Sequence, residues 1–229
     1  MKLLRRPARA DSAGTLREHR VVWQAASLLL AYPDDEHRAR LATVDELIAL
    51  LPHEAAAPLV TSIRALREQS DLDAATAYVE TFDLRRRTTL LLTYWTDGDT
   101  RNRGAAILRF ADTYRASGAR PPGDESADHL AVVLEFAATV DPDSGGRLLA
   151  ANRTAIDMLH EQLSDSGSPY AGVLGAVADT LPPAGELERR RARELALSGP
   201  PAEAVGLQPF TLTVPPRRDQ STRRSEGAQ

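Results

Sequence analysis

Apolar residues recur along most of this chain at intervals of three and four, which is the spacing of an amphipathic helix. The first stripe starts at Val21 and ends before Pro33, where the Asp34-Asp35 pair suits the start of the next helix. Only Phe210–Val214 alternates with period two, and this segment is too short to build a sheet. The predicted helical stripes are Val22, Ala26, Leu29 and Leu30; Leu41, Val44, Ile48 and Leu51; Leu59, Ile63 and Leu66; Leu72, Ala75, Val79 and Phe82; Ile107, Phe110, Ala111 and Tyr114; Leu130, Val133, Leu134 and Ala137; Leu149, Asn152, Ile156, Leu159 and Leu163; and Tyr170, Val173, Leu174, Val177 and Leu181. This pattern predicts an all-α protein.

The length of 229 residues predicts a single-domain helical bundle, here of roughly eight to ten helices. We expect the helical domain to cover residues 21–199 and to end with a polar, arginine-rich helix. Residues 1–20 are expected to form a flexible, retained, basic N-terminus, because no apolar stretch follows Arg5-Arg6 as it would in an export signal. Residues 200–229 are rich in Pro, Gly, Ser, Thr and Arg, so we expect a disordered or loosely attached tail.

The composition removes several classes of chemistry. The chain has no cysteine, which excludes disulfides, thiolate metal sites, iron–sulfur clusters and a cysteine nucleophile. Lys2 is the only lysine, and no two of the five histidines lie three or four residues apart, as a helical metal-binding pair would. Neither a Gly-x-Ser-x-Gly motif nor a phosphate-binding glycine loop is present. We therefore expect no catalytic residue, no bound metal and no cofactor, and the lack of a long apolar run argues against direct membrane insertion.

The distribution of charge indicates a basic partner. The formal net charge is −4, but residues 21–199 alone carry 27 acidic and 18 basic side chains. This acidic body argues against a nucleic-acid partner. Residues 121–146 contain six acidic side chains and no Lys or Arg, next to the apolar Val132 and Phe136. Such a surface suits a peptide that is basic at one end and apolar along one side.

Three polar residues within this stretch leave two further interpretations open. If Ser126 caps a helix, Asp128, Val132 and Glu135 share one face of it, with His129 beside them. Two carboxylates and an imidazole could form a small hydrolytic site by acid–base catalysis. In the alternative without a function, Asp128 only complements the helix dipole and Glu135 is solvated.

Two segments of the chain resemble a known family. The first runs from Tyr78-Val79-Glu80-Thr81-Phe82-Asp83 through Arg86 and Leu90-Leu91-Leu92 to Gly98, Arg101, Arg103 and Gly104. The second comprises Asp128-His129-Leu130 and Leu134-Glu135-Phe136. Together they resemble the signature of the NarJ-type nitrate reductase molybdenum-cofactor assembly chaperones, within the TorD/DmsD superfamily of redox-enzyme maturation chaperones.

The resemblance implies a TorD/NarJ-like, cytoplasmic chaperone that is not an enzyme. Members of this family bind the N-terminal segment of the apo catalytic α subunit of a membrane-bound nitrate reductase and allow insertion of the molybdenum cofactor before membrane attachment. That segment is basic and able to form an amphipathic helix. Another branch of the superfamily, which serves a dimethyl sulfoxide or trimethylamine N-oxide reductase, is the alternative chaperone interpretation. We expect a monomer or a weak dimer.

Helix-in-groove recognition assigns a role to the residues of both segments. The predicted client-binding residues are Tyr78, Phe82, Asp83, Arg86, Asp128, His129, Val132, Glu135 and Phe136, with Gly98, Arg101, Arg103 and Gly104 as structural residues. The aromatic residues would line an apolar floor, although Tyr78 and Phe82 could equally be core residues. The carboxylates would meet basic residues of the client, although Asp83 could instead pair with Arg86. His129 could make the affinity sensitive to pH, because its charge changes near neutrality.

Overall fold

The computed structural model describes residues 9–201 of the chain. The α-helices in this range are α1 (Arg9–Leu30), α2 (His37–Ile48), α3 (His53–Arg67), α4 (Asp71–Tyr78), α5 (Leu92–Asp97), α6 (Asn102–Ala116), α7 (Leu130–Thr139), α8 (Pro142–Ala151), α9 (Arg153–Asp165), α10 (Ala171–Asp179) and α11 (Glu186–Ser198), joined by a π-helical turn (Val79–Asp83) and a 3-10 turn (Arg86–Thr88). The described part of the chain contains no β-strand, so the predicted all-α class is confirmed. It has eleven α-helices where roughly eight to ten were expected.

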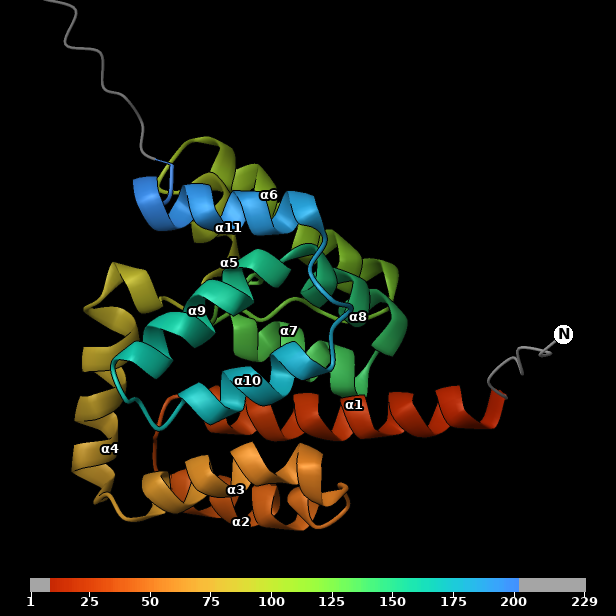
Figure 1. Cartoon of the computed structure of the whole chain (residues 1–229), viewed down its shortest axis with the longest axis vertical. Helices are drawn as coiled ribbons and strands as arrows, with labels where there is room; N and C mark the ends of the chain where they lie inside the picture. Colours follow the sequence, from red (N-terminus) through yellow and green to blue (C-terminus); the bar gives the residue numbers. More distant parts are fainter. Residues whose placement is uncertain (1–8, 202–229) are drawn as a thin grey trace, which may run out of the picture.

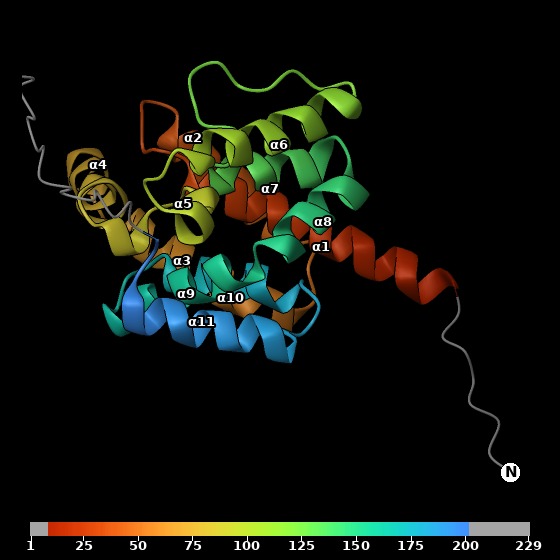
Figure 2. The ribbon, with the colours of Figure 1, turned by 90° about the horizontal axis from the view of Figure 1, so that it is seen from above.

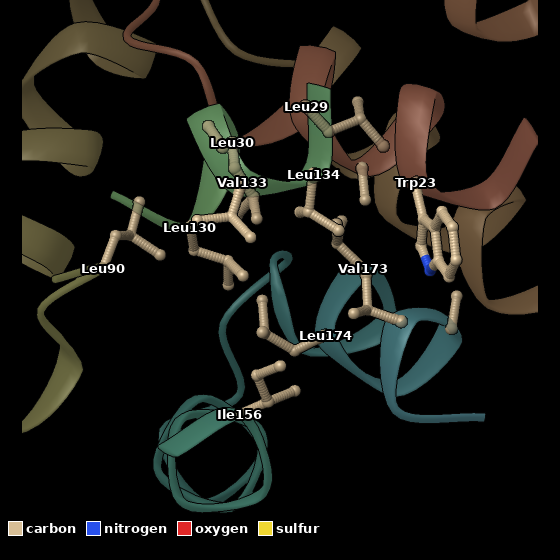
Figure 3. Packing of buried hydrophobic residues seen from close by; sticks show 14 of the residues in the cluster. Trp23, Leu29, Leu30, Leu90, Leu130, Val133, Leu134, Ile156, Val173 and Leu174 are labelled. Atoms are coloured by element: carbon tan, nitrogen blue, oxygen red, sulfur yellow. The ribbon is translucent and has the colours of Figure 1, made fainter. Parts of the chain in front are cut away.

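The long helix α1 crosses the molecule, with α2 and α3 on one side and α7 and α10 on the other (Figure 1). Helix α7 is its main partner and is buried on most of its circumference. Figure 3 shows Val133 and Leu134 of α7 between Leu30 of α1 and the Val173-Leu174 pair of α10. Each of these side chains is almost completely buried. Full burial stabilises the fold by about 1.5–3 kcal/mol for such a residue, so this layer holds the bundle together.

Polar side chains set the ends of several helices. The Ser70 hydroxyl accepts a hydrogen bond from the Asp73 backbone N–H at 3.2 Å and caps α4. The carboxylate of Asp141 accepts from the Ser144 N–H at 2.9 Å, and Pro142 occupies the first turn of α8. Hydrogen bonds to the charged form, from this N–H and from Ser117, lower the pKa of Asp141 to about 2. Asp141 therefore marks the break between α7 and α8.

The structure corrects two of the predicted boundaries. The expected limit between the N-terminal segment and the helical domain, at residue 20, lies inside α1, which begins at Arg9. The Arg20 guanidinium donates to the Ala138 carbonyl oxygen at 2.8 Å and joins this part of α1 to α7. The stripe expected to continue through Asn152 is divided there into α8 and α9, because the Asn152 side-chain amide donates to the Leu148 carbonyl oxygen at 2.8 Å. The remaining terminal residues, including Phe210–Val214, lie outside the described residues.

The predicted stripe before residue 83 was wrong at Leu72, and the buried residues of α4 are instead Ala74 and Tyr78. Leu72 is 76% exposed, Ala75 and Val79 are half-buried, and Phe82 alone of the stripe is in the core. The side chain that shares the buried face with Phe82 is Tyr78. A π-helical turn over Val79–Asp83 follows α4, and a search for regular helical spacing does not detect it.

The Gly145-Gly146 pair lies inside α8, and its two positions differ in the space around them. A Cβ at Gly145 would lie 2.4 Å from the Cα of Ala137 on α7, whereas a Cβ at Gly146 would be 3.4 Å from the Trp23 ring. The close packing of α7 on α8 therefore depends on the glycine at one position and not at the other.

We expect Gly145→Ala to lower the free energy of unfolding by about 1–3 kcal/mol, because the helices must move apart to admit the methyl group. Gly146→Ala in the same helix is the matched control. It should raise the free energy of unfolding by up to about 1 kcal/mol, since alanine is the better helix former. Urea unfolding followed by circular dichroism measures both. Equal effects of the two substitutions would contradict this packing.

Candidate functional site

A groove of about 660 Å³ opens between α1, the π-helical turn and α7. The residues that line it are Ser27, Leu28, Ala31, Tyr32, Tyr78, Phe82, Asp83, Thr89, Leu90, Leu91, Glu125, His129, Ala131, Val132 and Glu135. They come from four parts of the chain that are far apart in sequence. Both family-like segments contribute, so the fold brings together residues that the sequence analysis had singled out separately.

Two short backbone segments form one wall of the groove by antiparallel pairing. The Leu92 N–H donates to the Asp128 carbonyl oxygen at 3.1 Å, and the Leu130 N–H donates to the Leu90 carbonyl oxygen at 2.9 Å. Leu91 and His129 are the opposed residues of this bridge. Because side chains alternate along extended backbone, Leu91 and His129 line the groove while Leu92 and Leu130 enter the core.

The side chain of Asp128 does not line this groove, contrary to its predicted role in meeting the client. It has no exposed surface and precedes α7 instead of lying on the helix. Its carboxylate accepts hydrogen bonds from the backbone N–H and the hydroxyl of Thr93, at 3.0 and 2.6 Å, and from the Ser126 hydroxyl. Arg103 donates to the same Thr93 hydroxyl at 3.2 Å. Asp128 therefore positions the bridge and, through it, His129.

Aromatic residues make up the floor of the groove. The Tyr78 and Phe82 rings lie 4.8 Å apart, and Tyr170 of the chain segment before α10 lies 4.8 Å from Phe82. Tyr78 donates a hydrogen bond from its hydroxyl to the Leu30 carbonyl oxygen at 2.9 Å, and burial raises its pKa. Tyr78 and Phe82 are core residues, each about 95% buried, and they also line the groove.

The rim of the groove is acidic. Asp83, Glu125 and Glu135 are exposed carboxylates from three different elements, and no Lys or Arg is among the lining residues. Burial lowers the pKa of His129, opposed by the nearby carboxylates of Glu125, Asp128 and Asp83. The imidazole is therefore neutral at pH 7, and the groove is negative around an apolar floor.

Two other predicted binding residues lie elsewhere. The side chain of Arg86 is 81% exposed and faces Asp99, with 3.5 Å between guanidinium nitrogen and carboxylate oxygen, in a separate hollow. Phe136 packs against Tyr114, with ring centroids 4.6 Å apart, on the side of α7 that faces α6. By contrast, Val132 and Glu135 line the groove, because they share the exposed face of α7.

The residues predicted to be structural divide in the same way. Gly98 ends α5 with φ +59°, a conformation that favours glycine. Gly104 lies within the first turns of α6, and a Cβ there would meet open space. Arg103 binds Thr93 and Asp99, and Arg101 directly precedes α6.

Helix α1 contributes to the groove, which the periodicity of the sequence does not predict. Ser27, Leu28 and Ala31 line one side, and Tyr32 follows them with 49% of its surface exposed. Helical spacing alone assigns this part of α1 to the core. The Tyr32 ring packs edge-on against Tyr78, with centroids 5.5 Å apart. The tyrosine directly before Pro33 was the available signal, because tyrosine is enriched at interfaces.

Among residues 9–201 no group of three metal-ligating side chains is placed to hold a metal ion. Within the same range, no helix is both long enough and apolar enough to cross a bilayer.

A family model described as nitrate reductase delta subunit matches residues 48–175, more than half of the chain. The chain belongs to this family. The matched range of the delta-subunit family includes the π-helical turn, both bridge segments and α7, which supply most of the groove.

Individual relatives agree with the family. The chain is 51% identical over 167 residues, 73% of its length, to the nitrate reductase-like protein NarX of Mycobacterium tuberculosis, and this match spans 25% of the relative. It is 29% identical over 72% of its length to the probable nitrate reductase molybdenum cofactor assembly chaperone NarJ of Bacillus subtilis, covering 90% of that protein. The NarJ chaperone of Escherichia coli is 31% identical over 63% of each chain. The chain thus spans about a quarter of the NarX proteins and most of the Bacillus chaperone.

We expect Asp128→Ala to lower the free energy of unfolding by about 1–3 kcal/mol, because the N–H and hydroxyl of Thr93 lose their buried acceptor. Glu135→Ala removes an exposed carboxylate on α7 and serves as the control, with a change within about 0.5 kcal/mol. Chemical denaturation of both variants measures the difference. A free energy of unfolding that is unchanged in Asp128→Ala would rule out the positioning role of Asp128.

The lowered pKa of His129 makes stability depend on pH. The unfolded chain takes up a proton at this histidine near its ordinary pKa of 6.5 while the folded protein resists it, so stability decreases as the pH falls below 6.5. We expect His129→Gln to reduce the loss of stability between pH 7 and pH 5. The substitution His53→Gln, at an exposed histidine, is the control. Thermal melts across this range test the prediction, and parallel curves for all three proteins would contradict it.

Proposed function

We propose that this protein is an assembly chaperone for a nitrate reductase, which acts in the cytoplasm and binds the N-terminal segment of the apo catalytic α subunit before the molybdenum cofactor is inserted. The observation that carries the proposal is the groove with an aromatic floor and a rim of three carboxylates. The names of the Bacillus and Escherichia relatives, as nitrate reductase molybdenum cofactor assembly chaperones, support it.

The groove suits a basic amphipathic helix on two counts. Its floor offers the edges of Tyr78 and Phe82 and the side chain of Val132 to the apolar face of a peptide. Glu125 and Glu135 stand on the loop before α7 and on α7 itself, where they can meet basic residues from two sides. The carboxylates are exposed, so the free protein keeps them solvated, and the peptide's charges supply selectivity more than affinity.

The hydrolytic alternative loses its geometric basis. It requires Asp128, His129 and Glu135 in one pocket, but the Asp128 carboxylate is buried and bonded to Thr93 and Ser126 outside the groove. A chaperone for a dimethyl sulfoxide or trimethylamine N-oxide reductase would use the same kind of groove. The match to the delta-subunit family favours the nitrate reductase client.

We expect a synthetic peptide that copies the client's N-terminus to bind with low-micromolar affinity or better. The double variant Glu125→Gln/Glu135→Gln should weaken binding by about 2- to 30-fold, because each exposed ion pair contributes roughly 0.2–1 kcal/mol. Asp143→Asn removes an exposed charge on α8, outside the groove, and should leave the affinity unchanged. Isothermal titration calorimetry at two salt concentrations measures these effects.

Copurification identifies the client. A tagged full-length protein should retain the apo α subunit of a nitrate reductase, and retention of a different molybdoenzyme would assign the other branch. Absence of binding to both the peptide and the apo subunit would overturn the proposal.

A further inference from the structure

The chain that follows α11 passes directly over the end of α5. A Cβ on Gly98 would lie 1.6 Å from the carbonyl oxygen of Pro201, so this crossing requires glycine independently of the backbone angle. The turn is made at Gly199, which has φ +74° and donates its N–H to the Leu195 carbonyl oxygen at 2.8 Å. Figure 2 shows this last blue segment reaching from α11 towards α5. The described part of the chain therefore ends, at Pro201, beside the α5–α6 turn.

This point is close to the groove. Helix α5 has six residues, which corresponds to about 9 Å. Leu91, directly before α5, lines the groove. Residues 202–210 can span up to about 30 Å when extended, which is well beyond the length of α5. The sequence after Pro201 is thus long enough to enter the groove of its own molecule.

Residues 205–218 also have the chemistry that the groove selects. Apolar side chains alternate at Phe210, Leu212 and Val214, and Arg217-Arg218 follows. The segment contains no acidic residue. It therefore combines an apolar face with a basic end, the same combination that the aromatic floor and acidic rim favour in a client. Its three prolines and its period of two suit an extended chain more than a helix.

We propose that residues 205–218 occupy the client groove of their own chain when no client is bound. Phe210, Leu212 and Val214 lie against the aromatic floor, and Arg217-Arg218 faces the carboxylates of Glu125 and Glu135. A client binds in the groove by displacing this segment. Competition with a client rests on the proposed function, but the contact between the segment and the groove can be measured without a client.

The absence of cysteine allows a single-label test on the full chain. Ala31→Cys places the only thiol on the groove wall, where it is labelled with bimane, a fluorophore quenched by tryptophan at short range. Trp23 and Trp95 are buried and present in every variant. We expect Thr213→Trp to reduce bimane emission at least about twofold relative to the matched Ala228→Trp, which lies ten residues beyond the proposed segment.

Further variants test the mode of binding. Phe210→Ser/Leu212→Ser and Arg217→Glu/Arg218→Glu should each restore the emission. Dilution with unlabelled protein should leave the quenching unchanged, because the contact is within one chain. Equal emission from Thr213→Trp and Ala228→Trp, or quenching that is lost on such dilution, would overturn the proposal.

Addition of the client peptide separates this inference from the proposed function. Recovery of emission supports both, and Phe210→Ser/Leu212→Ser should then tighten peptide binding by about 3- to 10-fold, because the competent state is no longer occupied by the tail. If the tail quenches the bimane but the protein binds no peptide and the quenching persists, the tail contact is supported and the client assignment is contradicted. Peptide binding without quenching by the tail supports the client assignment and contradicts the tail contact.

Discussion

The buried carboxylate of Asp128 is the constraint on which the groove depends. It joins the backbone at Thr93 to the chain before α7, and the antiparallel bridge runs beside it. A charge without exposed surface is costly unless it is fully hydrogen-bonded, and here three donors satisfy it. Because it holds both bridge segments in one register, the same residue keeps Leu130 in the core and His129 in the groove wall.

Residues that stabilise the fold and residues that can meet a ligand are separated within the site. Tyr78 and Phe82 contribute most of their surface to the core and only an edge to the groove. Asp83, Glu125 and Glu135 are exposed and have little part in packing. Such a division lets the charge pattern of the rim change without loss of the fold, since exposed carboxylates contribute little to stability. A groove of this kind can be adapted to the charges of one partner.

Most of the core could be predicted from the sequence, because burial of one helix face produces a period that is visible locally. The stripes over Val22–Leu30 and Leu130–Ala137 are buried as predicted. Val132 and Glu135 line the groove, since they lie on the face of α7 that the buried stripe leaves exposed. Local periodicity contains no information on pairing between distant segments. Asp128 was therefore assigned to a helix face, although its partner, Thr93, lies 35 residues earlier.

The open groove raises the question of how selectivity arises at so simple a surface. An apolar floor with an acidic rim attracts any segment with a basic end and an apolar face, and the chain itself carries one in residues 205–218. A tethered segment acts at an effective concentration on the order of millimolar, so even a weak contact competes with ligands in solution. Only a client that binds the groove more favourably than the tethered segment would then displace that segment. Occupation by the tail would thus convert a general preference for basic amphipathic peptides into discrimination, without any further contact to the client.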